Sequence, residues 1–389
     1  MALAKNESLS EQLADHLASQ LVLKEREADF DMEDALEAHV LSPFKELHAA
    51  LLWLKSNLTE AWRNANREAL HSQSRHRLLA RIAIAAGTAA IVMAIVQPPV
   101  KETLALMIHV FPSLEWVKPI GGRFPTYLEV IAVAAAVVAV AVGLKAKFDR
   151  RWLGRRHRAE RLRMLKFRSL IQLWRLEPLA WQKWVTQQLA MLDDGDDPKN
   201  LEEWLTAEMV EPEVQDSLRS EPSLEFVGAL STYYRFKRVE FQANYFARRR
   251  EDFTKETGRW LHLSLPLFLG SVACVVVHLV FDAWAAWAKK RGEAGSEMYE
   301  MVAAWFLAFA AIFPVLGMGV RAWFAAFELP RSANLFAAKC RALRFLTNRL
   351  QEDVGNVMPT LRHIAHAEIF LEQEHREWLR LHRETEWFL

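Results

Sequence analysis

The chain has 389 residues, of which 49 are Lys or Arg and 48 are Asp or Glu, so its formal charge is only +1. This balance argues against a dedicated nucleic-acid-binding protein, and the length allows two or three domains. The averages conceal a segregation, because apolar residues gather in four runs and charged residues fill the intervals. Cys274 lies in an apolar run and Cys340 in a basic segment, which argues against a disulfide and a cysteine-based metal site.

Residues 1–77 are expected to form cytoplasmic helices. Ser8 and Glu11 have the spacing of a helix-capping box, and apolar residues recur at helical spacing from Pro43 to Trp62. These helices are interpreted as packing on the protein's own cytoplasmic part, with a docking region for a partner as the alternative. The N-terminus has no apolar core of the signal-peptide kind, so the internal apolar segments are expected to direct insertion.

Residues 78–148 are expected to form a first transmembrane hairpin. Its apolar runs are 78–96 and 128–144, and Arg81 stands one turn inside the first run, where a long side chain reaches the interface. Gln97-Pro98-Pro99 is predicted to end the first helix, because proline has no amide donor and restricts the residue before it. Both runs are short and rich in alanine, so a buried hairpin in a soluble protein remains the alternative.

Residues 149–255 are expected to form a cytoplasmic helical region between the two hairpins. The helical periodicity is broken at Pro178, and the acidic stretch 193–198 and Glu221-Pro222 mark further boundaries. Helix is predicted to resume near Phe226 and to continue directly into the next apolar run.

Residues 256–327 are expected to form a second transmembrane hairpin. Its first run, 260–281, contains no Asp, Glu, Lys or Arg and is long enough to cross about 30 Å of hydrocarbon as a helix. The second run, 301–320, returns the chain. Residues 328–389 are then expected to form the last cytoplasmic helices, with a break at 355–359.

Positive charge is concentrated before the first run, after the second, before the third and after the fourth. Such segments stay on the cytoplasmic side, so the distribution predicts four spans with both termini in the cytoplasm. The predicted fold is an all-α polytopic membrane protein of two hairpins in like orientation. Its halves are not inverted, which disfavours a small-solute transporter. Tryptophans are expected at the membrane boundaries: Trp116, Trp152, Trp260, Trp284, Trp287 and Trp323.

The second hairpin contains the candidates for a pore or gate. Prolines and glycines kink membrane helices, and histidines are the only plausibly ionisable side chains within its first run. Static kinks, and histidines that lie near water at the span ends, are the alternatives. Gly319 is a further interruption, and the candidate set is His262, Pro266, Gly270, His278, Pro314 and Gly317.

The first hairpin contains the candidates for close helix packing. Small residues four positions apart let two membrane helices approach closely. This packing is expected either within one chain or between the subunits of a homo-oligomer, and the sequence leaves both open. The candidate residues are Gly87, Ala135, Ala139 and Gly143.

A cluster of acidic and histidine side chains lies in the last helical region, at His363, His366, Glu368, Glu372 and His375. Glu372 and His375 have the Glu-x-x-His spacing of di-iron bundles, but such sites need a second copy and further glutamates from other helices, and no second copy stands at a suitable place, so we interpret this region as a solvated charged helix. No nucleotide-binding, hydrolase or metalloprotease motif is present. The sequence therefore predicts no catalytic residue, no cofactor and no metal site.

The segment before the second hairpin resembles a known family. Tyr233-Tyr-Arg-Phe-Lys-Arg-Val-Glu-Phe-Gln242 and Tyr245-Phe-Ala-Arg-Arg-Arg250, followed by an apolar hairpin, resemble the opening of SLATT-type effectors. The charged helix 331–344 resembles the helix that leaves the second span in that family, and residues 161–168 resemble that helix more loosely. The chain departs from the family in having two hairpins and a long inner region.

The resemblance implies an effector of the bacterial inner membrane that oligomerises and permeabilises or disrupts the bilayer in anti-phage defence. Its implied partners are the lipid bilayer, further copies of the chain, and a defence-system sensor or nucleotide signal. The basic block 145–168 is assigned to anionic lipid heads rather than to a specific nucleic acid. The alternative function is a non-catalytic membrane scaffold for a soluble enzyme.

Overall fold

The computed structural model describes residues 14–15, 17–18, 41–117, 121, 123–193, 198–208, 222–292, 295–327, 329–352 and 356–384. Every regular element in these residues is a helix and none is a strand, which confirms the all-α prediction. The predicted capping box at Ser8 and Glu11 lies outside the described residues.

The chain divides into two compact units, which are described separately below. Unit 1 consists of Met1–Ser74, Phe148–Glu251 and Ala333–Glu386. Unit 2 consists of Arg75–Lys147, Asp252–Ser332 and Trp387–Leu389. Each unit therefore gathers segments that are far apart in the sequence.

Unit 2 contains the four apolar runs. They lie in α3 (Lys45–Val110), α5 (Phe124–Ala146), α11 (Ser264–Arg291) and α12 (Ser296–Phe327), with the short helix η1 (Pro112–Val117) after α3. Each apolar run is long enough and apolar enough to cross a membrane. Little of their surface is buried, and Phe268 and Leu265 on α11 are each about two-thirds exposed.

The prediction that Gln97-Pro98-Pro99 ends the first helix is wrong, because α3 continues through both prolines to Val110. Proline fits the helical φ angle, so its cost here is the missing amide donor. Neighbouring polar groups surround this point: Thr103 donates its hydroxyl to the Pro99 carbonyl at 2.7 Å. The Gln97 amide in turn donates to the Glu129 carboxylate on α5.

Helices α11 and α12 run antiparallel along each other. The Ser271 hydroxyl donates to the Ala310 carbonyl at 2.8 Å, and His278 Nδ1 contacts the Ala303 carbonyl at 2.9 Å. The rings of Phe281 and Phe306 stack with centroids 6.1 Å apart. From Ser271 to His278 on α11, the carbonyl contacted on α12 moves back from Ala310 to Ala303, which requires the two helices to run antiparallel.

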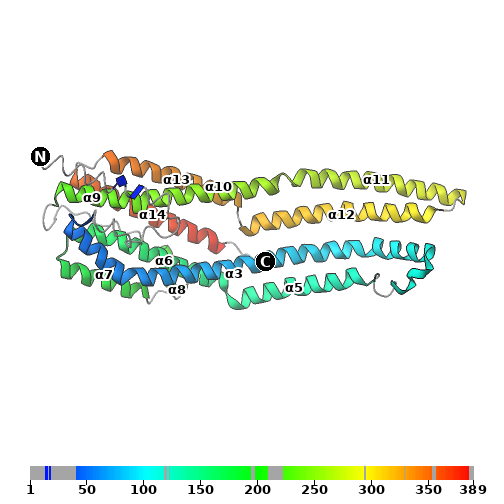
Figure 1. Ribbon diagram of the computed structural model, residues 1–389, viewed down its shortest axis with the longest axis horizontal. Helices are drawn as coiled ribbons and strands as arrows, with labels where there is room; N and C mark the ends of the chain where they lie inside the picture. Colours follow the sequence, from blue (N-terminus) through cyan, green and yellow to red (C-terminus); the bar gives the residue numbers. More distant parts are fainter. Residues whose placement is uncertain are drawn as a thin grey trace. The chain divides into compact units, whose positions relative to one another are not determined.

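Unit 1 is a layered helical body that packs around α6 (Figure 1). It contains α6 (Phe148–Ile171), η2 (Gln172–Trp174), α7 (Pro178–Asp193), α8 (Pro198–Thr206), α9 (Leu224–Tyr234), η4 (Arg235–Glu240) and α14 (Val357–Glu384). It also contains α3 up to Ser74, α10 (Phe241–Leu261) up to Glu251 and α13 (Leu329–Glu352) from Ala333 onward. The predicted break at Pro178 is confirmed, because that proline opens α7. The Ser223 hydroxyl accepts a hydrogen bond from the Phe226 amide and so caps α9.

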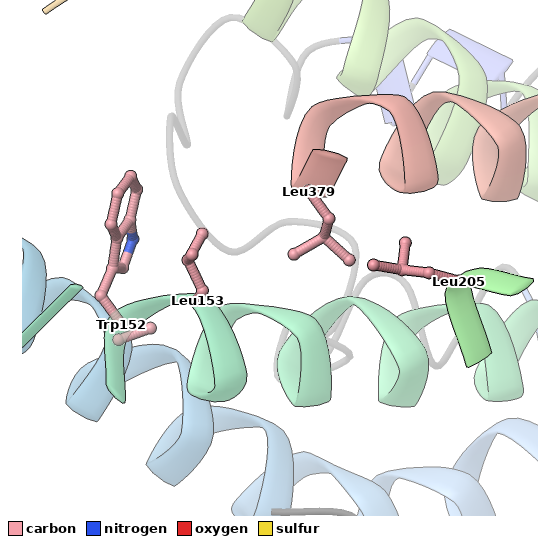
Figure 2. Close-up of a cluster of buried hydrophobic side chains, with 5 residues drawn as sticks. Trp152, Leu153, Leu205 and Leu379 are labelled. Atoms are coloured by element: carbon pink, nitrogen blue, oxygen red, sulfur yellow. The ribbon is translucent and has the colours of Figure 1, made fainter. Parts of the chain in front are cut away.

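The core of unit 1 includes a cluster of large side chains from several helices (Figure 2). Trp152 and Leu153 come from α6, Leu379 from α14, and Leu205 from α8. The prediction of Trp152 at a membrane boundary is wrong, because only 4% of its surface is exposed and its ring packs edge-on against Trp378. Burying so large a ring contributes on the order of 2 kcal/mol or more.

Two glycines on α12 give a matched test of packing in unit 2. A Cβ at Gly319 would lie 2.8 Å from the Thr88 hydroxyl, whereas a Cβ at Gly317 would meet nothing within 4 Å. We expect Gly317→Ala to be neutral or stabilising by up to about 1 kcal/mol, because alanine favours helix more than glycine does. Gly319→Ala is expected to lower the thermal midpoint, followed by circular dichroism in detergent micelles.

Adding Thr88→Ala to Gly319→Ala removes the clashing hydroxyl and should restore the midpoint. Equal midpoints for the two single alanine variants would contradict the packing of α12 on α3 within unit 2.

Candidate functional site

Helix α14 places a row of charged side chains in the interior of unit 1. Glu372 follows Glu368 by four residues, and His375 and Arg376 follow Glu372 by three and four residues, which places all four along one side of the helix. Their exposed fractions are 0%, 4%, 4% and 6%. The interpretation of this region as a solvated charged helix is therefore wrong for Glu368, Glu372 and His375, whereas His363 is half-buried and His366 is exposed. The same face carries the buried apolar side chain of Leu371, so it belongs to the core.

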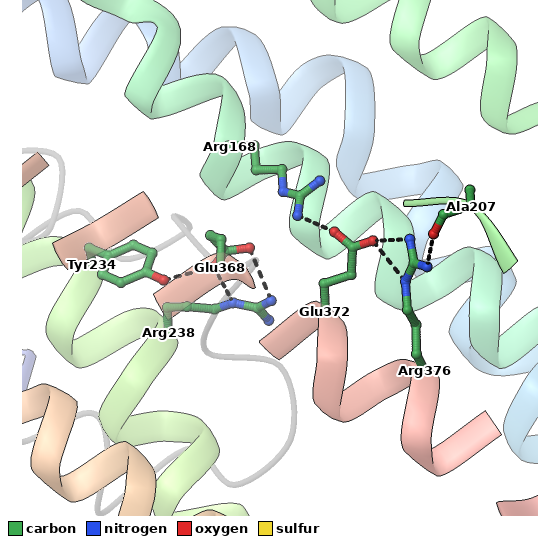
Figure 3. Close-up of polar contacts among 7 residues, drawn as sticks. All are labelled: Arg168, Ala207, Tyr234, Arg238, Glu368, Glu372 and Arg376. Atoms are coloured by element: carbon green, nitrogen blue, oxygen red, sulfur yellow. Dashed lines mark hydrogen bonds and ion pairs between the residues drawn. The ribbon is translucent and has the colours of Figure 1, made fainter. Parts of the chain in front are cut away.

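Glu368 forms the most deeply buried ion pair described in unit 1 (Figure 3). Arg238 reaches it from the π-helical segment η4, with Nε 2.9 Å from one carboxylate oxygen and a terminal nitrogen 3.3 Å from the other. The Tyr234 hydroxyl donates to the same carboxylate at 2.8 Å. Burial raises the pKa of Tyr234, and the Glu368 carboxylate raises it further. The hydroxyl therefore remains a donor at physiological pH.

Glu372 connects α14 to α6 through Arg168, and its other partner, Arg376, also bonds Ala207, the residue that follows α8 (Figure 3). Arg168 on α6 donates to one of its oxygens, and Arg376 donates to the other at 2.7 and 3.1 Å. Arg376 also donates to the Ala207 carbonyl at 2.5 Å. Burial raises the pKa of Glu372, but the two guanidiniums outweigh burial and hold that pKa below its usual value.

Two buried histidines continue the row. His157 Nδ1 and His375 Nε2 lie 3.2 Å apart, and the two rings stack nearly parallel. Burial lowers the pKa of His157 to about 2 and that of His375 to about 3, so both rings are neutral at physiological pH. Glu160 lies nearby and pairs with Arg156 at 2.5 Å and Arg163 at 2.6 Å.

These contacts fasten the helices of unit 1 and leave the acidic groups occupied by cations. Glu372 and His375, which share the Glu-x-x-His spacing, have different partners: two guanidiniums for Glu372 and a neutral imidazole for His375. Within the residues that the structure describes, no group of three or more His, Cys, Asp or Glu is arranged to hold a metal ion. The arrangement is suited to holding helices in one register.

The basic block after the first hairpin is partly buried in this core. Arg163 and Lys166 are each 4% exposed, and their cations lie over the rings of Trp62 and Phe167. The assignment of the whole block 145–168 to lipid heads is therefore wrong for these residues. Arg150 and Arg151 in the same block are exposed.

The six pore or gate candidates lie in different environments. His278 is half-buried on α11 and contacts the Ala303 carbonyl, as described above. A Cβ at Gly270 would lie 3.1 Å from the Phe313 ring, so this glycine permits a close approach of α11 to α12. Gly317 is half-buried, and a Cβ added there would meet no atom within 4 Å. The remaining three are exposed: His262, Pro266 and Pro314.

The helix-packing candidates differ in burial. Ala139 and Gly143 are buried on α5, and Ala135 is half-buried four residues earlier. Gly87 is half-buried, and a Cβ there would meet nothing within 4 Å. The close approach on α3 occurs instead at the next residue, where Thr88 meets Gly319.

Sequence reasoning missed the ionic row because its partners are distant in the chain. Arg238 and Glu368 are separated by 130 residues, and Arg168 and Glu372 by 204. The signal that the sequence does contain is the three- and four-residue spacing of charges on a helix face that also carries buried leucines.

Removing one partner of the deepest pair tests its role. Glu368→Leu leaves Arg238 buried without its countercharge, so we expect it to destabilise unit 1 by about 3–5 kcal/mol. The double variant Glu368→Leu with Arg238→Met replaces both charges by apolar groups and should cost far less. The measurement is the thermal midpoint and denaturant midpoint of the full chain in detergent.

The matched control for this pair is Glu352→Ala, which breaks an exposed pair with Arg349 at 3.6 Å and should cost less than about 1 kcal/mol. A Glu368→Leu variant as stable as Glu352→Ala would contradict the buried ion pair.

The buried histidines predict loss of stability in acid. Their folded pKa values lie below the ordinary value of 6.5, so between pH 6.5 and about 3 the unfolded chain binds more protons than the folded chain. The free energy of unfolding should therefore fall as the pH falls through this window, by about 1.4 kcal/mol per pH unit for each fully protonated unfolded histidine.

His375→Gln should flatten this dependence, measured as the denaturant midpoint between pH 7 and pH 4. His71→Gln, at an exposed position on α3, is the control and should leave the slope unchanged. Parallel curves for the two variants would contradict the neutral buried histidine.

Comparisons of the chain with family models, with characterised proteins and with solved structures found no match. The features of the described residues that bear on function are the apolar helices of unit 2 and the buried ionic row of unit 1.

Proposed function

We propose that this chain is a polytopic protein of the bacterial inner membrane, in which unit 2 spans the bilayer four times and unit 1 lies in the cytoplasm. The observation that carries this proposal is the apolar surface of α3, α5, α11 and α12, of which little is buried within the protein. Side chains such as Val276 on α11 and Val137 on α5 are more than half exposed. A monomeric soluble protein rarely exposes apolar patches of this extent, whereas a bilayer covers them.

The distribution of charge supports the proposed orientation. Lys and Arg are dense in α6 directly after α5 and in α10 directly before α11, which are the segments that join the apolar helices to unit 1. Positively charged flanking segments are retained in the cytoplasm. The two termini then share the cytoplasmic side.

The proposed activity is permeabilisation or disruption of this membrane by an oligomer of the chain, on a signal received by unit 1. The support is the resemblance to SLATT-type effectors, together with small residues on the apolar helices. Small residues allow helices of neighbouring subunits to pack closely in lipid. In this proposal unit 1 is the receiver, because its ionic row joins helices from distant parts of the chain into one body.

A specific observation favours the second candidate, a non-catalytic membrane scaffold for a soluble enzyme. Two polar side chains of α11, Ser271 and His278, contact carbonyl groups of α12. Contacts of this kind hold a helix pair together and leave these groups no role in lining an aqueous path.

Release of a trapped dye from liposomes separates the two candidates. An effector should release the dye when the full chain is incorporated together with its activating partner, whereas a scaffold should retain it under every condition. Leu269→Arg with Val276→Arg places two charges on exposed apolar positions of α11, and each costs about 2.5–3.5 kcal/mol at the centre of a span. This variant should lose both insertion and release.

The control is Leu179→Arg, at a position of unit 1 that is 79% exposed, and it should insert and release like the parent chain. Dye release that persists in the α11 double variant would overturn the proposed mechanism.

A further inference from the structure

Unit 1 contains a cavity of about 130 Å³ beside the ionic row of α14. It is lined by residues of α6, α7, α8 and α14. Three of the lining residues are buried and apolar, namely Met164, Leu165 and Leu192. The remaining lining residues are arginine, tryptophan, glutamine and a single carboxylate, which is an unusual set for a packing defect between helices.

The charges around the cavity are not balanced. Arg161 and Arg168 line it together with Glu372, and Arg376 is bonded to the same carboxylate. Three guanidiniums therefore surround one carboxylate. Burial lowers the pKa of Arg161, and the other two guanidiniums lower it further while Glu372 opposes them. An additional anion in the cavity would relieve this unfavourable environment.

Several donor groups in the lining form no hydrogen bond with the described part of the chain. Arg161 and Gln188 form no hydrogen bond with any residue in the part of the chain that the structure describes. The Nε atom of Arg168 is buried and likewise has no acceptor among those residues. A buried donor is normally satisfied, so the unpaired Nε of Arg168 is unusual, and Arg161 and Gln188 add further donors at the same cavity. Together these donors suit a ligand with several acceptor oxygens.

We propose that this cavity binds a phosphate monoester group. A phosphate monoester carries between about −1.5 and −2 charges at pH 7 and has three acceptor oxygens, which match the excess cationic charge and the unused donors. Guanidinium groups bind phosphate through paired hydrogen bonds. The cavity is smaller than the 300–1,000 Å³ or so of sites that enclose drug-sized ligands, so it holds the phosphate and adjoining atoms while the rest of the ligand stays outside.

The aromatic lining indicates what accompanies the phosphate. Trp204 is engaged by Arg376, whose guanidinium carbon lies 4.5 Å from the ring centroid. Trp184 is half-buried and has no ring partner among the described residues, so its indole is available to pack on a planar group attached to the phosphate.

Occupancy of the cavity is coupled to the ionic row. An anion bound to Arg161 and Arg168 would share the Arg168 guanidinium with Glu372. The ion pair of Arg168 with Glu372 is the contact that joins α6 to α14. All the lining residues belong to unit 1, so the site does not depend on the function proposed for unit 2. A role for the bound ligand as the activating signal rests on the proposed function.

The test is isothermal titration of the purified full chain in detergent micelles. The probes are inorganic phosphate, adenosine monophosphate and adenosine, and vesicles with and without phosphatidic acid test a lipid source of the same group. We expect the phosphate-bearing probes to bind and adenosine not to bind. Binding of the soluble phosphates assigns a soluble ligand, and binding of phosphatidic acid vesicles alone assigns a lipid headgroup to the site.

Arg161→Gln should weaken binding at least about tenfold, because hydrogen bonds to a charged group are lost. The matched control is Arg150→Gln, at an exposed position of the same helix, which should bind like the parent chain. Gln188→Leu removes an amide without changing any charge and should also weaken binding, which keeps the test valid if Arg161→Gln does not fold.

The site is overturned if no phosphate-bearing probe binds at concentrations up to about 10 mM, or if Arg161→Gln and Arg150→Gln bind equally. Adenosine binding as tightly as its monophosphate would overturn it as well. Failure of dye release with intact phosphate binding would refute the membrane effector and leave the site standing. The reverse result would refute the site alone.

Discussion

The structure of unit 1 depends on the rule that a charge removed from water must be paired. Glu368 is fully buried, so α14 can occupy its place only where Arg238 and Tyr234 meet it. A small rotation or shift of α14 would leave several charges without partners at once. Hydrophobic packing holds these helices together, and the ionic row selects one register among the arrangements that packing alone would allow. The three segments of unit 1 are thereby specified as one body.

In unit 2 the corresponding rule concerns polar side chains on apolar helices, which also need a hydrogen-bonding partner. Its helices carry few polar side chains, and Gln97, Thr103, Ser271 and His278 each contact a polar group of the protein. An apolar surrounding does not compensate an unpaired polar group, so such pairing is a requirement for a helix that crosses lipid.

The local features of this fold could be predicted from the sequence, whereas the distant pairings could not. The apolar run 260–281 can be recognised by its length and lack of charge, and Pro178 marks a helix start because proline fits the first turn. The prediction that helix continues directly into this run is wrong, because α10 ends at Leu261 and α11 begins at Ser264 after a turn. Trp152, Glu372 and His375 were misassigned because periodicity reveals a helix face but not what covers it. Tryptophan suits a membrane boundary and a protein core equally well. Only the contact of Trp152 with Trp378, more than two hundred residues away, decides between them.

The residues that carry the family resemblance have a structural meaning of their own. Tyr233, Tyr234, Arg238 and Gln242 are all buried in unit 1, and residues 235–240 of this motif form the π-helical segment that presents Arg238 to Glu368. These buried residues anchor the helical segment to unit 1 before the chain continues into the apolar helix α11. The arginines of α6 behave differently, because Arg163 and Arg168 are engaged by carboxylates while Arg161 lines a cavity and has none bonded to it. Arg161 is therefore the arginine of this group whose donors are left for a ligand, while the aromatic motif fastens η4 to α14 through Arg238 and Tyr234.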